Sequence, residues 1–266
     1  MTDPVITDHS TNNSGWSVLL EDGPVLAINK PAGLLTQAPA SVPSLEAEIK
    51  AWLKARFDKP GNVYLGIPHR LDRGVSGVIL FTKNSKAAAR MAEQFEKRQV
   101  RKIYWAIVEG VPASAAGEMQ DWLLKLPEQS RAEIVEPGTQ GARECRLSYR
   151  VLAQSDSEVL GSHSLVEIEP HTGRMHQIRV QFAHRGWPII GDEQYGSARS
   201  LRGLLPQLDI ADARGCPIAL HARSLTFQHP VRYDSLTVTA PLPDYWPLSM
   251  APSDVPLDGD SVPTSA

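Results

Sequence analysis

Apolar and polar residues alternate, or recur at regular spacing, along most of this chain. Residues 143–151 place Cys145, Leu147, Tyr149 and Val151 on one face and polar side chains on the other, which predicts a half-exposed, antiparallel strand. Apolar runs between turn signals predict further short strands, two within 16–30 and one each at 78–82, 103–108, 164–169, 219–227 and 236–240. Strands are therefore expected from one end of the chain to the other.

A helical period appears first after Ser44. Leu45, Ile49 and Leu53 recur at the spacing of one helix face, and serine is a preferred residue at a helix N-terminus. Acidic residues in the first turn also suit the positive end of the helix dipole. We therefore expect a helix over residues 45–57.

Two further helices are predicted. One starts after Asn84 or Ser85, and the other covers 174–185, where Gly186 is typical of a residue that ends a helix. The apolar residues expected on the inner face of the first of these helices are Ala88, Met91, Ala92 and Phe95.

The succession of these elements predicts an α+β fold. Helices interrupt the strands irregularly, so the strict alternation of a doubly wound parallel sheet is absent. No linker, low-complexity tract or repeat divides the chain, and we expect one folded domain at 16–247. The flanking segments 1–15 and 248–266 are polar and lack periodicity, so both are expected to be disordered tails.

Composition and charge narrow the class of function. Hydrophobic residues make up 42% of the chain, but no apolar run approaches the ~18 residues that a membrane-spanning helix needs. The N-terminus also lacks a secretory signal, so we expect a cytoplasmic protein without a membrane partner. The net charge of −3 does not favour nucleic acid, yet residues 69–102 hold nine Lys or Arg against three carboxylates. That local excess predicts a phosphate-facing patch.

The segment His-Arg-Leu-Asp-Arg-Gly-Val-Ser-Gly at 69–77 contains the best candidate for chemistry. Asp72 lies between Arg70 and Arg73, and neighbouring guanidinium groups favour the ionised carboxylate. Asp72 is therefore a candidate nucleophile or base rather than an acid. Taken alone, this pattern is more typical of a salt bridge in a surface loop, so the assignment depends on other segments.

Several such segments occur in order along the chain. They are Asn-Lys-Pro-Ala-Gly-Leu at 29–34, Lys-Ile-Tyr at 102–104, Gly-Arg-Met-His-Gln-Ile-Arg-Val at 173–180, Gly-Asp-Glu-Gln-Tyr-Gly at 191–196 and Leu-His-Ala-Arg-Ser-Leu-Thr-Phe-Gln-His-Pro at 220–230. With the segment at 69–77, they resemble the RluA-type pseudouridine synthases over about residues 16–247. The resemblance implies an isomerase that converts uridines of rRNA or tRNA to pseudouridine. It also implies a central mixed, mostly antiparallel sheet with an active-site cleft across it.

The resemblance assigns catalytic roles to three residues. Asp72 matches the essential aspartate, Tyr104 matches the aromatic residue that lies against the target base, and Arg179 matches the arginine that pairs with the aspartate. A uracil within a duplex must be flipped out before it can react, and an aromatic platform stabilises a flipped base by ~1–3 kcal/mol. The family's aspartate either attacks the sugar or abstracts a sugar proton, and the sequence leaves both paths open.

Contacts with RNA are implied around these residues. Arg70 matches the motif arginine that holds or displaces RNA, while Ile178 and Val180 flank Arg179 as apolar packing beside the pocket. Substrate binding is also expected of His69, Arg73, Lys102 and Lys30. The implied partner is a structured RNA, a stem-loop of rRNA or tRNA, bound by a monomer that needs no metal and no organic cofactor.

Three alternatives were weighed against this interpretation. His171 with His176, or His69 beside Asp72, could suggest a metal site, but their spacing fits no zinc or metalloprotease pattern. A glycosidase needs two facing carboxylates, whereas these motifs supply one. An RNA-binding protein without catalysis is disfavoured because the catalytic residues implied by the resemblance are all present.

The chain also departs from the family pattern. Val75 stands where threonine is usual, so a hydroxyl that could brace the loop is absent, and Gln181 stands where histidine is frequent. Many members carry an N-terminal S4 RNA-binding domain, and none is expected here because the catalytic domain starts by residue 16. RNA selection is then expected to depend on the catalytic domain itself and its basic face near 83–102.

Overall fold

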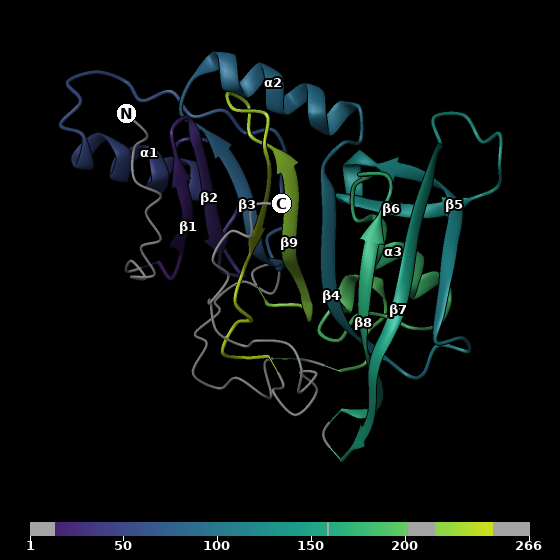
Figure 1. The fold of residues 1–266 in the computed structure, drawn as a ribbon. Helices are drawn as coiled ribbons and strands as arrows, with labels where there is room; N and C mark the ends of the chain where they lie inside the picture. Colours follow the sequence, from purple (N-terminus) through teal and green to yellow (C-terminus); the bar gives the residue numbers. More distant parts are fainter. Residues whose placement is uncertain (1–13, 159, 200, 202–215, 247–266) are drawn as a thin grey trace.

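The computed structural model describes residues 14–158, 160–199, 201 and 216–246 (Figure 1). The tails predicted at 1–15 and 248–266 lie outside the described residues, apart from Ser14 and Gly15. The strands are β1 (Ser17–Asp22), β2 (Val25–Lys30), β3 (Ser76–Thr82), β4 (Arg101–Glu109), β5 (Ala116–Leu126), β6 (Arg131–Val135), β7 (Arg143–Ser157), β8 (Gly161–Pro170), β9 (Leu220–Gln228) and β10 (Ser235–Thr239). The α-helices are α1 (Leu45–Arg56), α2 (Ser85–Glu96) and α3 (Gln177–His184).

One ten-stranded sheet organises the fold. Its order is β1-β2-β3-β9-β4-β8-β7-β5-β6, and β10 pairs with β9 (Figure 1). The pair formed by β3 and β9 is parallel, and the other pairs of the described strands are antiparallel. The predicted α+β fold with a mixed, mostly antiparallel sheet is therefore confirmed.

The parallel pair forms a short seam between two parts of the sheet. β3 and β9 are paired only at Ser76 with His221 and at Gly77 with Ala222. Gly77 has a φ of +112°, and a Cβ there would lie 2.3 Å from the carbonyl oxygen of Ala222, so only glycine allows this close approach. Beyond the seam, the Nε2 of His69 accepts a hydrogen bond of 2.9 Å from the Leu80 amide on the free edge of β3.

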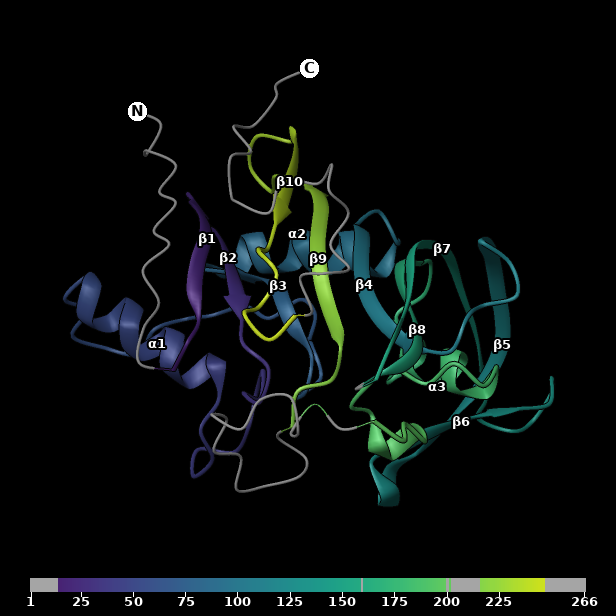
Figure 2. The ribbon, with the colours of Figure 1, turned by 90° about the horizontal axis from the view of Figure 1, so that it is seen from below.

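The helices pack on the sheet at separate places. α2 packs on β3, while α3 packs on β5 and β6 at the other end of the sheet (Figure 2). In β2 and β3, the core residues Leu26, Ile28, Ile79, Leu80 and Phe81 are fully buried. Among the described residues, no helix is long and apolar enough to cross a membrane.

Local capping explains why two of the predicted helices were placed correctly. Ser44 accepts a hydrogen bond from the Ala47 amide at the start of α1, and Asn84 does the same for Ala87 in α2. The predicted inner face of α2 was wrong in one position, because Ala92 is exposed. The buried side chains of α2 are Ala87, Met91 and Gln94.

The third helix and one hairpin differ from expectation. α3 starts at Gln177 rather than at 174, because His176 adopts a left-handed conformation with a φ of 54° that cannot continue a helix. β5 and β6 form a hairpin that was not predicted. In β5 only Met119 and Leu123 are buried, so its hydrophobic pattern is weak.

Candidate active site

A cleft of about 630 Å³ opens beside the seam of the sheet. Asp72 lies at its edge, in the loop that enters β3, and its side chain is 35% exposed. Other lining residues come from α2, β4 and the segment before α3, and include Phe95, Arg98, Lys102, Tyr104, His171 and Arg174. The cleft therefore joins a carboxylate to aromatic and basic side chains from distant parts of the chain.

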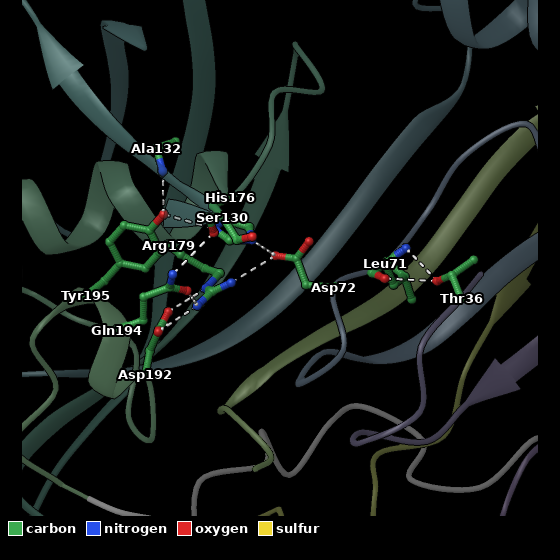
Figure 3. A network of polar contacts seen from close by, with 10 residues as sticks. All are labelled: Thr36, Leu71, Asp72, Ser130, Ala132, His176, Arg179, Asp192, Gln194 and Tyr195. Carbon is green, nitrogen blue, oxygen red and sulfur yellow. Dashed lines mark hydrogen bonds and ion pairs between the residues drawn. The ribbon is translucent and has the colours of Figure 1, made fainter. Parts of the chain in front are cut away.

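The backbone of the Asp72 loop is braced by Thr36. The Thr36 hydroxyl donates to the carbonyl oxygen of Leu71 at 2.9 Å and accepts from the Leu71 amide at 3.2 Å (Figure 3). Both groups are buried, so the side chain satisfies two polar atoms that water cannot reach. Thr36 thus supplies a hydroxyl that braces the loop, although Val75 lacks one.

Lys30 also holds the Asp72 loop, through hydrogen bonds to backbone carbonyl oxygens. Its fully buried Nζ donates to the carbonyl oxygens of Pro31 at 2.8 Å, Leu34 at 2.7 Å and Arg73 at 3.3 Å. Burial lowers the pKa of Lys30 to about 7, although the negative charge of Asp72 opposes this change. The Gly33 amide also donates to the Arg73 carbonyl at 2.8 Å, so the segment at 29–36 holds the loop at several points.

On the opposite side of Asp72, Arg179 provides the charged contact. Its Nη1 lies 3.2 Å from Oδ2 of Asp72, whereas Nε and Nη2 bind Asp192 at 2.6 and 2.8 Å (Figure 3). Nη2 also donates to Gln194 at 2.9 Å. Burial disfavours the charged form of Arg179, but its hydrogen bonds and the charges of Asp192 and Asp72 outweigh this effect and raise its pKa. Asp192 therefore fixes the guanidinium that faces Asp72.

His176 and Tyr195 complete this side of the site. The Nε2 of His176 lies 3.6 Å from Oδ2 of Asp72, and its Nδ1 lies 2.8 Å from the Tyr195 hydroxyl. That hydroxyl accepts a hydrogen bond of 2.9 Å from the Ala132 amide, and the Tyr195 ring lies 4.9 Å from the Arg179 guanidinium. Two charged or polar side chains thus approach the same oxygen of Asp72 (Figure 3).

Tyr104 lines the cleft from β4. The register of β4 against β9 shifts by one residue between Ile103 and Tyr104, which is a β-bulge, a feature that often re-aims a side chain near a site. Burial raises the pKa of the Tyr104 hydroxyl, and the nearby charge of Asp72 raises it further. Tyr104 is therefore protonated at neutral pH and can donate a hydrogen bond.

The other predicted site residues fall into two groups. His69, Arg70, Lys102 and Ile178 line the cleft together with the three predicted catalytic residues. Lys30, Arg73 and Val180 are absent from its lining. Val180 packs in a small cluster with Leu123 and Tyr195, and the Nε of Arg73 donates to the Gly33 carbonyl at 2.9 Å.

Sequence reasoning gave no role to several residues of the site. Asp192, Gln194 and Tyr195 belong to the segment 191–196, which was noted as a motif without a function. His176 was considered only as a metal ligand. Its position two residues before Ile178 and three before Arg179, on a segment already assigned to the site, was the available signal.

Among the described residues, no group of three His, Cys, Asp or Glu side chains is arranged to hold a metal ion. The polar groups at the site instead contact one another. Their arrangement presents a carboxylate, a fixed guanidinium and a protonated phenol to one cleft.

Residues 24–184 match the protein family described as RNA pseudouridylate synthase. The chain is 34% identical over 236 residues to the tRNA pseudouridine synthase C of Haemophilus influenzae, covering 86% of this chain and 94% of that protein. It is 33% identical over 240 residues to the ribosomal large subunit pseudouridine synthase D of Xylella fastidiosa, covering 90% and 69%.

Solved structures agree with these relatives. The human RNA pseudouridylate synthase domain containing 4 superposes with a TM-score of 0.68 at 28% identity, covering 86% of this chain and 89% of that chain. The human RNA pseudouridylate synthase domain containing 1 has a TM-score of 0.64 at 22% identity over 92% and 89% of the two chains, a likeness of fold.

Proposed function

This chain belongs to the RNA pseudouridylate synthase family, and we propose that it acts on structured tRNA or rRNA with Asp72 as the catalytic carboxylate. The observation that carries the assignment is the position of Asp72, which is partly exposed at the cleft and 3.2 Å from a buried guanidinium. Asp72 is the carboxylate of the cleft that combines exposure to a substrate with a fixed cationic partner.

The reaction breaks the bond from ribose C1′ to uracil N1, rotates the base and forms a new bond from C1′ to C5. The hydrogen on C5 leaves as a proton and N1 gains a proton, so no redox step is needed. In one path Asp72 attacks the sugar, and in the other it abstracts a sugar proton. Both paths use the Asp72 carboxylate, which has the cationic Arg179 at 3.2 Å.

Tyr104 is suited to hold the flipped base. It lies in the same cleft as Asp72, and its aromatic ring can stack on a pyrimidine for ~1–3 kcal/mol. Its hydroxyl stays protonated because burial raises its pKa, so it can also donate a hydrogen bond to the base. We therefore assign Tyr104 to stacking and Asp72 to bond cleavage.

The rim of the cleft is suited to RNA. Arg70, Arg98, Lys102, His171 and Arg174 line it, and all come from segments near Asp72 or Tyr104 in space. Basic side chains contact phosphates without regard to sequence, so they fix the position of a nucleic acid rather than its identity. This lining supports a substrate class of structured RNA, and relatives named for tRNA and for ribosomal RNA support both sources.

The replacement Asp72→Asn tests the catalytic assignment. We expect pseudouridine formation to fall by more than roughly a thousandfold, since the amide can neither attack nor accept a proton effectively. RNA binding, measured by filter binding, should remain within about threefold of the wild type because no phosphate contact is removed. Turnover above roughly a thousandth of the wild-type rate would contradict this assignment.

The substrate is tested by mapping pseudouridines in tRNA and rRNA from cells with and without the gene. We expect one or more sites to be lost from one of these RNAs and restored by the wild-type gene but not by D72N. Unchanged maps in both RNAs would overturn the proposed substrate class. The catalytic assignment of Asp72 would still be tested separately by the kinetics of D72N.

A further inference from the structure

We propose that Tyr195 and His176 form a positioning pair that directs an N–H group at Oδ2 of Asp72 and leaves Oδ1 as the reacting oxygen. The proposal rests on the catalytic role of Asp72 proposed above. Neither Tyr195 nor His176 is required to react with the substrate. Their task is to fix which face of the carboxylate is free.

The hydrogen bonds of Tyr195 determine where its proton lies. Its hydroxyl accepts from the Ala132 amide at 2.9 Å and lies 2.8 Å from Nδ1 of His176. A hydroxyl has one proton to donate, and Nδ1 is its partner on the imidazole. The hydroxyl therefore donates to Nδ1, and the proton of the neutral imidazole is on Nε2.

Asp72 favours the same tautomer. Nε2 of His176 lies 3.6 Å from Oδ2 of Asp72, so a proton on Nε2 points toward a negative charge. The other tautomer would direct the Nε2 lone pair at that charge and would be disfavoured. The distance is slightly long for a hydrogen bond, as is common for catalytic contacts without substrate.

The two oxygens of Asp72 then differ. Oδ2 receives Arg179 Nη1 at 3.2 Å and faces His176, whereas Oδ1 accepts no hydrogen bond from the part of the chain that is described. Figure 3 shows both contacts meeting the carboxylate from one side. The unoccupied oxygen is thus the one available to the substrate.

The surroundings keep His176 neutral and in place. Burial lowers the pKa of His176, and the positive charge of Arg179 acts in the same direction, while Asp72 and Asp192 oppose both. Its φ of 54° is uncommon for a residue other than glycine, and such strain persists only where the surroundings enforce it. A neutral imidazole has two tautomers, so the partner at Nδ1 decides which one is present.

Imidazole ¹⁵N chemical shifts test the tautomer independently of activity. With ¹⁵N-labelled histidine, and with the His176→Asn variant used to assign the signal, we expect the wild type to carry the proton on Nε2. In Tyr195→Phe the share of the Nδ1–H form should rise, since the donor to Nδ1 is gone and only Asp72 still favours the proton on Nε2. Asp72→Asn serves as an inactive control, and its spectrum still reports on His176 and Tyr195. A failure of the catalytic assignment of Asp72 can therefore be told apart from a failure of the positioning pair.

Kinetics under single-turnover conditions test the consequence. Tyr195→Phe should lower the catalytic rate about tenfold, the loss expected from one hydrogen bond to a charged group. KM should change by less than roughly twofold, because no RNA contact is removed. If Tyr195 had a purely structural role, Y195F would lower thermal stability, because the Ala132 amide loses its partner, but it would not lower the catalytic rate at nearly constant KM.

Two replacements of His176 keep the proposal testable if Y195F unfolds. Asparagine tolerates the left-handed backbone but is too short to reach Asp72, whereas the amide of glutamine extends as far as Nε2. We expect His176→Gln to retain roughly fivefold more activity than H176N. Equal activity of the two variants, or an unchanged tautomer in Y195F, would overturn the proposal.

Discussion

The segment at 30–36 and the segments around α3 both hold the loop that carries Asp72, but they contact different parts of that loop. Thr36 and Lys30 bind backbone atoms of the loop, at Leu71 and Arg73. Arg179 contacts the carboxylate itself, and its orientation is fixed by Asp192. One side therefore sets where the loop lies, and the other sets the orientation of the Asp72 carboxylate.

This division has a physical basis. Backbone hydrogen bonds are individually worth ~1 kcal/mol, and their loss is felt mainly as stability. Charged contacts in a buried site act on the ionised carboxylate, so their loss changes the reaction as well. We therefore expect variants on the charged side to lose more activity than variants on the backbone side.

The largest effect is expected from Asp192→Asn. The buried guanidinium of Arg179 would lose its anionic partner, which costs about 3 kcal/mol of unfolding free energy. Turnover should fall roughly a hundredfold, because Arg179 is no longer held at its 3.2 Å distance from Asp72. Urea unfolding and single-turnover rates measure the two losses.

Asp121→Asn is the matched control for this prediction. Asp121 accepts a bidentate contact of 2.9 and 3.1 Å from Arg185, just beyond the other end of α3 and away from the cleft lining. We expect D121N to lose stability with a turnover within about twofold of the wild type. Comparable turnover losses in both variants would show that α3 affects catalysis by general loosening.

Lys30→Met should have an intermediate effect. The carbonyl oxygens of Pro31 and Leu34 lose their lysine donor, and that of Arg73 keeps only the Gly33 amide. The unfolding free energy should therefore fall by about 2 kcal/mol, and turnover by roughly tenfold as the Asp72 loop loosens. Lys83→Met is the control, since Lys83 pairs with Glu21, which Arg56 also contacts. Turnover of K30M equal to that of K83M would contradict a positioning role for Lys30.

We expect acid to lower the unfolding free energy through His69, which holds the Leu80 amide of β3. Burial lowers the pKa of His69 from 6.5 to about 3, so the unfolded chain binds more protons between these values. The contribution of His69 to the unfolding free energy is therefore fully present above pH 6.5 and is lost as the pH falls toward 3. At pH 5 the loss from this histidine is about 2 kcal/mol.

The His69→Gln variant isolates this part of the pH dependence. The glutamine oxygen can still accept from the Leu80 amide but does not titrate. Comparing urea unfolding at pH 7 and pH 5, we expect H69Q to lose about 2 kcal/mol less than the wild type. His221, whose pKa burial also lowers to about 3, keeps its own contribution in both proteins.

The smallest effect is expected from Thr36→Val. Loss of the hydroxyl leaves two buried backbone groups of Leu71 without a partner and should cost about 1 kcal/mol. Turnover should stay within about threefold, since Lys30 and Gly33 still hold the loop. Thr36→Ser keeps the hydroxyl and should match the wild type. A larger turnover loss in T36V than in D192N would contradict the proposal that the charged contacts matter more for the reaction than the backbone contacts.

Much of the fold could be predicted because its signals are local. Ser44 and Asn84 cap helices through contacts three residues away, and the alternation at 143–151 follows from one buried face of β7. The pairing of β3 with β9 has no local signal. It depends on Gly77 meeting Ala222 across a long separation in sequence.

The candidate site was predicted where motif order identified residues, as for Asp72 and Tyr104. The burial of Lys30 could not be predicted, because a buried lysine is stable only where carbonyl oxygens converge on it, and here those of Pro31 and Leu34 are joined by that of Arg73 from another loop. The link from Asp192 through Arg179 to Asp72 likewise depends on the tertiary fold. Sequence order therefore predicted which residues gather at the cleft more readily than how they are held there.

The place of β9 in the sheet also determines when the site can form during synthesis. Asp72 precedes β3 and Tyr104 lies in β4, and the strand that lies between β3 and β4 is β9, which the ribosome makes later than every other sheet strand except β10. Until residues 220–228 emerge, the two parts of the sheet have no strand to join them. The nascent chain therefore joins the two parts of the sheet at the candidate active site only after β9 has emerged, through long-range pairing of the kind that slows folding.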